Sequence, residues 1–177
     1  ETGHIPIYVA AVRSKMLQLA GEMFDGVIFP SMSSCQYIRR ALEEIRIGAE
    51  RAGRKLADVD VASMTVTSVS SDSKRAKAAA RETPSYLRFL SREDRGVMML
   101  GPEYRDQLNL VREALREGDV KSVSRHVTDD MVDLVTVAGT PEECKERLKE
   151  YVSTGVSLPI IVPAPGSDFA AAMKTFT

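Results

Sequence analysis

The sequence lacks most features that mark secreted, membrane-spanning or nucleic-acid-binding proteins. Its two cysteines, Cys35 and Cys144, are too few for a disulfide framework, so we expect a reducing, cytoplasmic compartment. No apolar run approaches the roughly 18 residues that predict a membrane span. Lys and Arg number 24 against 25 Asp and Glu. This balance argues against a broad electrostatic surface for nucleic acid or an anionic membrane.

Compact catalytic motifs are also missing. The chain has no G-x-S-x-G nucleophile elbow, no glycine-rich phosphate loop and no G-x-G-x-x-G fingerprint. His4 and His126 have no Cys, Asp or Glu at metal-ligand spacing, so no metal site is predicted. Neither Cys35 nor Cys144 has a second thiol nearby, and both are interpreted as buried apolar side chains. The catalytic residues therefore stay unknown at this stage.

The sequence does contain enough apolar residues for a core. With 177 residues, of which 44% are apolar, it predicts one domain over residues 1–177. The chain begins at Glu1 rather than Met and enters a strand-like run within a few residues. We expect such a chain to be a piece of a longer protein.

Apolar patterning predicts an alternation of strands and helices. Short apolar runs predict strands over 5–11, 27–29, 59–69 and 158–162. Helical spacing, caps and stop signals predict helices over 15–24, 35–53, 74–81, 141–153 and 169–176. Residues from about 84 to 137 read as a segmented helical insertion between the third and fourth strands. This order predicts an α/β fold of four parallel βα units.

The turn after the first predicted strand is a candidate phosphate cradle. It reads A-A-V-R-S-K-M and opens a helix, whose N-terminus offers free N–H groups and a positive dipole end. Arg13 and Lys15 add positive charge, and ligands of parallel α/β folds bind beyond the carboxyl ends of strands. The alternative is that Ser14 is an ordinary helix cap and the two cations are surface residues.

The same region carries a family resemblance. The string I-P-I-Y-V-A-A-V-R-S-K-M-L-Q-L-A-G-E-M-F-D-G-V-I-F resembles the bacterial-luciferase-like family. It is most similar to the branch of deazaflavin (coenzyme F-420) dependent oxidoreductases, which includes methylenetetrahydromethanopterin reductase. Two later blocks agree in the family's order, A-E-R-A-G-R with D-V-D and V-A-G-T-P-E-E-C with G-V.

The resemblance implies a fold. Members of the family are (β/α)8 TIM barrels, and the matching blocks belong to the second half of that barrel. The four predicted strands would then be the fifth to the eighth, and the chain would be the C-terminal half. The first half carries many residues around the reactive ring, so the resemblance implies that this chain is inactive alone.

The resemblance also implies a cofactor site. In the family, the turn after the first strand seen here holds the phosphate-bearing tail of the deazaflavin or flavin. The matching positions are Ala11, Val12, Arg13, Lys15 and Met16. Many relatives have Gly-Pro where this chain has Arg13-Ser14, and this departure leaves the cofactor open between coenzyme F-420 and FMN.

Three functions follow as hypotheses. The first is part of an oxidoreductase that transfers a hydride between coenzyme F-420 and a small organic substrate. The second is an FMN-dependent monooxygenase of the same fold. The third is a non-catalytic half-barrel assembly module, because four parallel strands cannot close a barrel alone and leave open edges. The expected partner is accordingly a second copy, giving a homo-oligomer, or the missing N-terminal half-barrel.

Overall fold

A single parallel sheet organises the chain. The structure is a computed structural model that describes the backbone of residues 3–177, and all their side chains except those at 84, 85, 93, 120, 121 and 124. The sheet contains five strands: β1 (Tyr8–Ala10), β2 (Gly26–Phe29), β3 (Asp60–Val69), β4 (Thr136–Gly139) and β5 (Leu158–Pro163). All the pairings are parallel, as the alternating pattern predicts.

The long strand β3 is the centre of this sheet. Its first half pairs with β2 and its last residues pair with β4, while β5 pairs along residues that overlap both. Since a strand has two edges, β2 and β4 share one edge of β3 and β5 takes the other. Among the described residues β1 pairs only with β2, and β5 pairs only with β3. One edge of each is therefore left open.

Strand β4 corrects the sequence-based prediction. Residues up to 137 were expected to be helical, but helix α8 (Asp129–Val135) ends where Thr136–Gly139 begins to pair with β3. A run of four residues is too short for its periodicity to distinguish a strand from a buried helical turn. The pairing with β3 decides the conformation, and the sheet gains a strand that the sequence pattern did not predict.

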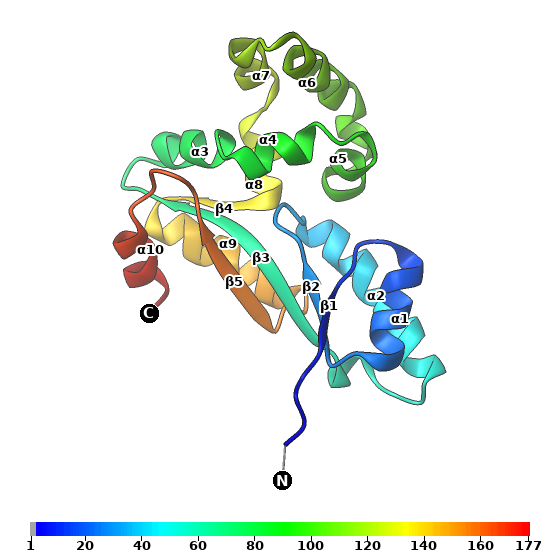
Figure 1. Cartoon of the computed structure of the whole chain (residues 1–177). Helices are drawn as coiled ribbons and strands as arrows, with labels where there is room; N and C mark the ends of the chain where they lie inside the picture. Colours follow the sequence, from blue (N-terminus) through cyan, green and yellow to red (C-terminus); the bar gives the residue numbers. More distant parts are fainter. Residues whose placement is uncertain (1–2) are drawn as a thin grey trace.

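Helices cover one face of the sheet. Helices α1 (Ser14–Met23), α2 (Cys35–Arg51) and α9 (Pro141–Ser153) follow β1, β2 and β4, and α10 (Phe169–Phe176) follows β5. In Figure 1, α9 lies behind β3 and β5, and no helix crosses in front of them. A short 3-10 helix, η1 (Leu56–Asp58), leads from α2 into β3.

The two faces of the sheet differ in burial. Side chains paired in register share a face, so Val9, Val27 and Val61 lie together, and they pack in the core. On the opposite face, Ile28 and Met64 are only partly buried. The outer face is thus covered by helices, whereas the inner face, where Val66 is buried but Ile28 and Met64 are not, is covered only in part, as in a partial barrel. This arrangement confirms the predicted fold class.

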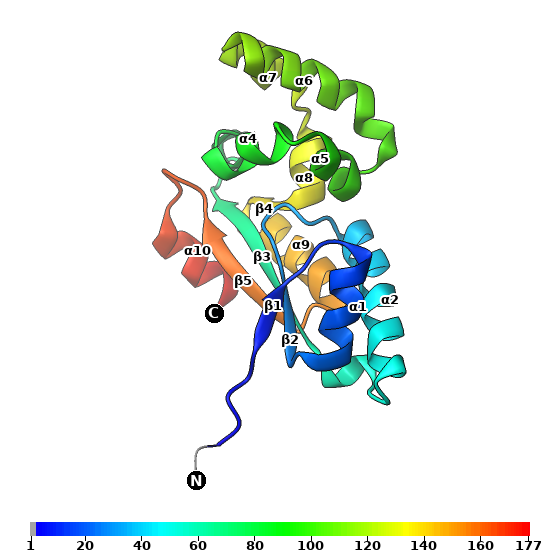
Figure 2. The same ribbon diagram turned by 45° about the vertical axis from the view of Figure 1, so that its right-hand side comes forward.

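The helical insertion lies beyond the carboxyl ends of β2 and β3 (Figures 1 and 2). It comprises α4 (Pro84–Leu90), α5 (Glu93–Leu100), η2 (Pro102–Tyr104), α6 (Arg105–Glu117), α7 (Val120–His126) and α8, and helix α3 (Ser73–Arg81) leads from β3 into it. Met99 and Leu100 are each 1% exposed, so the carboxyl end of α5 lies in the core. The assignment of residues 1–177 to one domain stays a prediction.

The structure also tests the predictions made for the two cysteines. Cys35 and Cys144 are free and buried, as predicted, and burial raises the pKa of both thiols, that of Cys144 to about 12. Neither is therefore an activated nucleophile.

Within residues 3–177, no helix is both long and apolar enough to cross a membrane.

Candidate functional site

The turn between β1 and α1 and the first residues of α1 together contain all five predicted cofactor-binding residues. Ala11 is 3% exposed and packs in the core, so it positions the turn rather than offering a side chain. Val12 is half-buried, while Arg13 and Lys15 are exposed. Met16 is 41% exposed in the first turn of α1. The surface of the turn is therefore mainly cationic.

The N-terminus of α1 is unlike those of the other helices that follow strands. Ser34, Asp72, Thr140 and Asp168 cap α2, α3, α9 and α10, each accepting a hydrogen bond from its first turn. Arg13 is the N-cap residue of α1 and makes no such bond through its side chain. The alternative prediction that Ser14 caps this helix is wrong, because Ser14 is its first helical residue. The first N–H groups of α1, which have no intrahelical partner, thus point out of the helix without a side-chain cap.

A cavity of about 470 Å³ adjoins this helix N-terminus. It lies among the turn, α2 and α5, and is lined by Val12, Arg13, Ser14, Leu17, Tyr37, Arg40, Ala41, Glu44, Val97 and Met98. The Tyr37 hydroxyl donates a hydrogen bond to the Val12 carbonyl at 2.8 Å and so fixes the turn. Burial raises the pKa of Tyr37 to about 12, so the hydroxyl remains a neutral donor.

The insertion contributes to the same cavity. Arg13 makes an ion pair with Asp94 in the first turn of α5. Arg40 Nη2 donates to the Met98 carbonyl at 3.0 Å, and the Ser34 hydroxyl donates to the Met99 carbonyl. Helix α5 is thus docked across the end of the predicted tail-binding turn.

Sequence reasoning did not find Tyr37, Arg40 or Asp94. Tyr37 lies on the apolar stripe of a predicted helix, and Asp94 lies 81 residues from its partner Arg13. No periodic pattern indicates an ion pair across that separation. Only the docking of the insertion onto the turn reveals these contacts.

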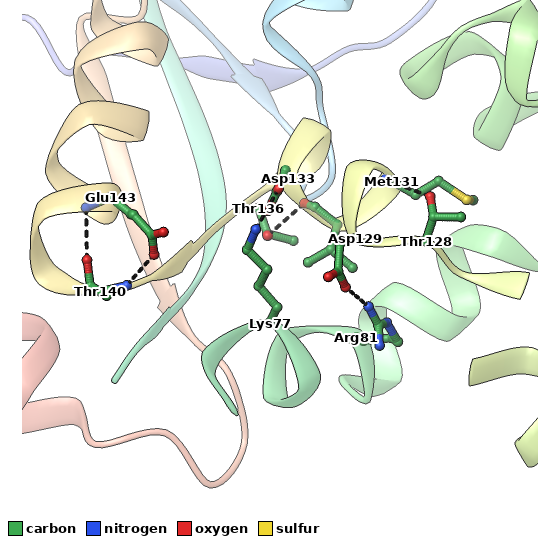
Figure 3. Close-up of polar contacts among 10 residues, drawn as sticks. Lys77, Arg81, Thr128, Asp129, Met131, Asp133, Thr136, Thr140 and Glu143 are labelled. Atoms are coloured by element: carbon green, nitrogen blue, oxygen red, sulfur yellow. Dashed lines mark hydrogen bonds and ion pairs between the residues drawn. The ribbon is translucent and has the colours of Figure 1, made fainter. Parts of the chain in front are cut away.

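A second polar cavity, of about 380 Å³, lies where α3, α8, β4 and α9 meet. Lys77 Nζ lies 2.7 Å from Asp133, and Arg81 pairs with Asp129 (Figure 3). At the start of α9, the Thr140 N–H donates to Glu143 at 2.7 Å, and Thr140 Oγ1 accepts from the Glu143 N–H at 3.3 Å. These charged groups are paired within the protein, so this cavity has a structural role in joining α3 to α8.

The turn after β1 has the chemistry of a site for an anion. Exposed guanidinium and ammonium groups flank an uncapped helix N-terminus, and both features favour a phosphate or carboxylate. Arg13 can also offer two parallel N–H groups to one oxyanion.

Comparison with known proteins identifies the family. Residues 1–158 match the family described as luciferase-like monooxygenase. This chain therefore belongs to the luciferase-like family of (β/α)8 barrels, as its motifs predict.

Two curated relatives are 5,10-methylenetetrahydromethanopterin reductases. The protein from Methanolobus tindarius is 33% identical over 158 residues, which cover 89% of this chain and 48% of that protein. The protein from Archaeoglobus fulgidus is 35% identical over 159 residues, covering 88% and 47%. The chain thus spans about half the length of these relatives.

A solved structure agrees with the fold. The coenzyme F-420 dependent tetrahydromethanopterin reductase from Methanopyrus kandleri superposes with a TM-score of 0.74 at 26% sequence identity. The superposition covers 91% of this chain and 45% of that one.

Proposed function

We propose that this chain is the second half of a coenzyme F-420 dependent oxidoreductase of the methylenetetrahydromethanopterin reductase type. The turn from Ala11 to Met16 binds the phosphate-bearing tail of the cofactor. The observation that carries this proposal is the uncapped N-terminus of α1 with Arg13 at the N-cap, beside the exposed Lys15. Two similar proteins whose names specify coenzyme F-420 support the choice of cofactor: a glucose-6-phosphate dehydrogenase that is 28% identical and the tetrahydromethanopterin reductase structure described above.

In this proposal the residues of this chain bind the phosphate-bearing tail of coenzyme F-420, and the deazaflavin ring takes part in the hydride transfer. When bound, coenzyme F-420 would donate a hydride to a small organic substrate or accept one from it. Arg13 and Lys15 neutralise the phosphate, and the first N–H groups of α1 donate to it. Tyr37 keeps the turn in place through the Val12 carbonyl. No residue of this chain is assigned to proton or hydride transfer.

The rest of the barrel is the proposed partner. The inner face carries partly buried apolar side chains, including Ile28, Met64 and Ile160, none of which packs against the main core. The open edges of β1 and β5 border this face. A luciferase-like N-terminal half-barrel would pair with both edges and cover the face. The chain is accordingly proposed to be inactive without it, and a homo-oligomer stays a prediction.

A titration with each cofactor tests the proposal. We expect the 177-residue chain to bind coenzyme F-420 saturably, followed by the fluorescence of the deazaflavin. The Arg13→Gln variant should bind about tenfold to a hundredfold more weakly, since a hydrogen bond to a charged group contributes about 1.5–3 kcal/mol. Arg105→Gln, which removes an exposed arginine at the start of α6, is the control and should bind as the parent does.

The alternative cofactor is an outcome of the same titration. Because Arg13-Ser14 replaces the Gly-Pro of many relatives, FMN is titrated in parallel. Saturable binding of FMN without binding of coenzyme F-420 would contradict the proposal and favour a flavin monooxygenase. Equal binding by the parent and by Arg13→Gln would show that the tail lies elsewhere.

A further inference from the structure

Helix α5 is attached to the rest of the protein very differently at its two ends. At its carboxyl end, Met99 and Leu100 are each 1% exposed. The backbone carbonyls of Met98 and Met99 there accept hydrogen bonds from Arg40 of α2 and from Ser34, its N-cap. At its amino end, the N-cap Arg92 makes no side-chain cap bond. The polar link from that end to the turn after β1 is the ion pair between Asp94 and Arg13.

This ion pair is exposed and therefore weak. The Arg13 side chain is 69% exposed and the Asp94 side chain 58% exposed. Solvent screening limits such surface pairs to a small net contribution. A phosphate oxyanion forms stronger, bidentate hydrogen bonds with a guanidinium group. The pair can thus hold α5 in place and still give way to an anion.

Asp94 is also the carboxylate that meets Arg13. The carboxylate that does line the cavity, Glu44, accepts a hydrogen bond from Gln18 Nε2 at 2.7 Å. A phosphate bound at the turn would face Asp94 at close range, and two anions at one guanidinium repel each other. Binding of the tail and retention of the ion pair therefore oppose each other.

We propose that Asp94 is an internal competitor for the anion site, and that binding of a phosphate-bearing ligand at Arg13 releases the amino end of α5. The inference rests on the proposed function of the turn, and it adds a device that relates cofactor binding to the insertion. If the bound ligand weakens the ion pair, then by thermodynamic linkage the ion pair weakens binding of the ligand by the same factor. Removing the Asp94 charge should therefore tighten anion binding.

The first measurement uses no ligand. Asp94→Asn should speed amide hydrogen exchange over residues 96–98, the first amides of α5 with an intrahelical acceptor, and leave the carboxyl end of α5 protected. The matched control is Asp106→Asn, which removes the same charge at the second position of α6, where Asp106 is exposed. Exchange in α5 that is no faster in Asp94→Asn than in the control overturns the proposal without bearing on cofactor binding.

The second measurement is calorimetric titration of the 177-residue chain with coenzyme F-420 and with inorganic phosphate. Asp94→Asn should bind both about twofold to fivefold more tightly than the parent, while Asp106→Asn should match the parent. Ligand should also speed exchange over residues 96–98 in the parent. Unchanged or weaker binding by Asp94→Asn, with binding still lost in Arg13→Gln, overturns this inference alone. Absence of binding by the parent overturns the proposed function and this inference together.

Discussion

The N-termini of α9 and α1 are built in opposite ways. Helix α9 begins with a capping box in which Thr140 and Glu143 satisfy each other's backbone N–H groups, and Pro141 occupies its first position. Helix α1 begins at the N-cap residue Arg13, whose side chain makes no hydrogen bond with the backbone N–H groups of the first turn. Both helices lie on the covered face of the same sheet. The difference shows that a cap is not needed to place a helix on this sheet.

Packing takes the place of a cap in α1. Gly21 of α1 and Gly48 of α2 let the two helix backbones approach closely, and a Cβ at Gly48 would lie 1.9 Å from the Gln18 carbonyl oxygen. Because α1 is held along its length by this contact, its N-terminus can remain open to a ligand. The α9 terminus, by contrast, is closed by its own residues.

The largest expected effect removes this close contact. Gly48→Ala should destabilise the protein by about 3 kcal/mol, because the added methyl group meets backbone that cannot move aside. Intrinsic helix propensity alone predicts a gain of up to about 1 kcal/mol for the same change. Urea unfolding followed by circular dichroism measures the sign. A stabilised variant would show that α1 is not held by its packing on α2.

Removing the α9 cap should have a smaller effect. Thr140→Ala is expected to lower the free energy of unfolding by about 1 kcal/mol, because the Glu143 N–H loses its acceptor. Ser153→Ala is the control at the other end of the helix, where an exposed hydroxyl contacts only the Glu150 carbonyl of the same turn. That variant should stay within about 0.5 kcal/mol of the parent. Equal effects would mean that the capping box does not stabilise α9.

Introducing an N-cap residue at the start of α1 should raise the stability of the protein and lower its affinity for the cofactor. Arg13→Ser places a cap residue at an extended backbone position, with φ −114° and ψ 148°. We expect a net stability gain of about 0.5 kcal/mol, since the cap outweighs the loss of an exposed ion pair. Affinity for coenzyme F-420 should fall about tenfold or more.

The control for this variant is Arg92→Ser, the same change at the uncapped start of α5. It should stabilise the protein without weakening cofactor binding. Loss of affinity in both variants would mean that general positive charge, rather than Arg13, attracts the ligand.

The smallest effect is the pH dependence of the α9 cap. The Thr140 N–H, then Ser73 and then the charge of Lys77 lower the pKa of Glu143 below its ordinary value. A carboxyl group with a lowered pKa stabilises the folded state above its unfolded pKa, and this contribution disappears as pH falls through the folded pKa. The difference in stability between the parent and Glu143→Gln should therefore shrink between about pH 6 and pH 3. Urea unfolding across that range measures it, and a constant difference would contradict the assignment.

Local signals predicted most of the elements. The cap at Asp72, the capping box at Thr140 and the left-handed Gly53 after α2 stand where the sequence places helix ends. These features depend on neighbours within a few residues, so the sequence contains them directly. The predicted tail-binding turn likewise lies in one contiguous stretch, from Ala11 to Met16.

What the sequence determined by itself is therefore the order of the strands and helices other than β4, the ends of several helices and the cationic turn, because each depends on contacts within about one turn of chain. Only the tertiary structure decided that Thr136–Gly139 is a strand, since its conformation comes from pairing with β3. It also decided that Tyr37 and Asp94 meet the turn, because the docking of α2 and the insertion brings together residues that no local pattern relates.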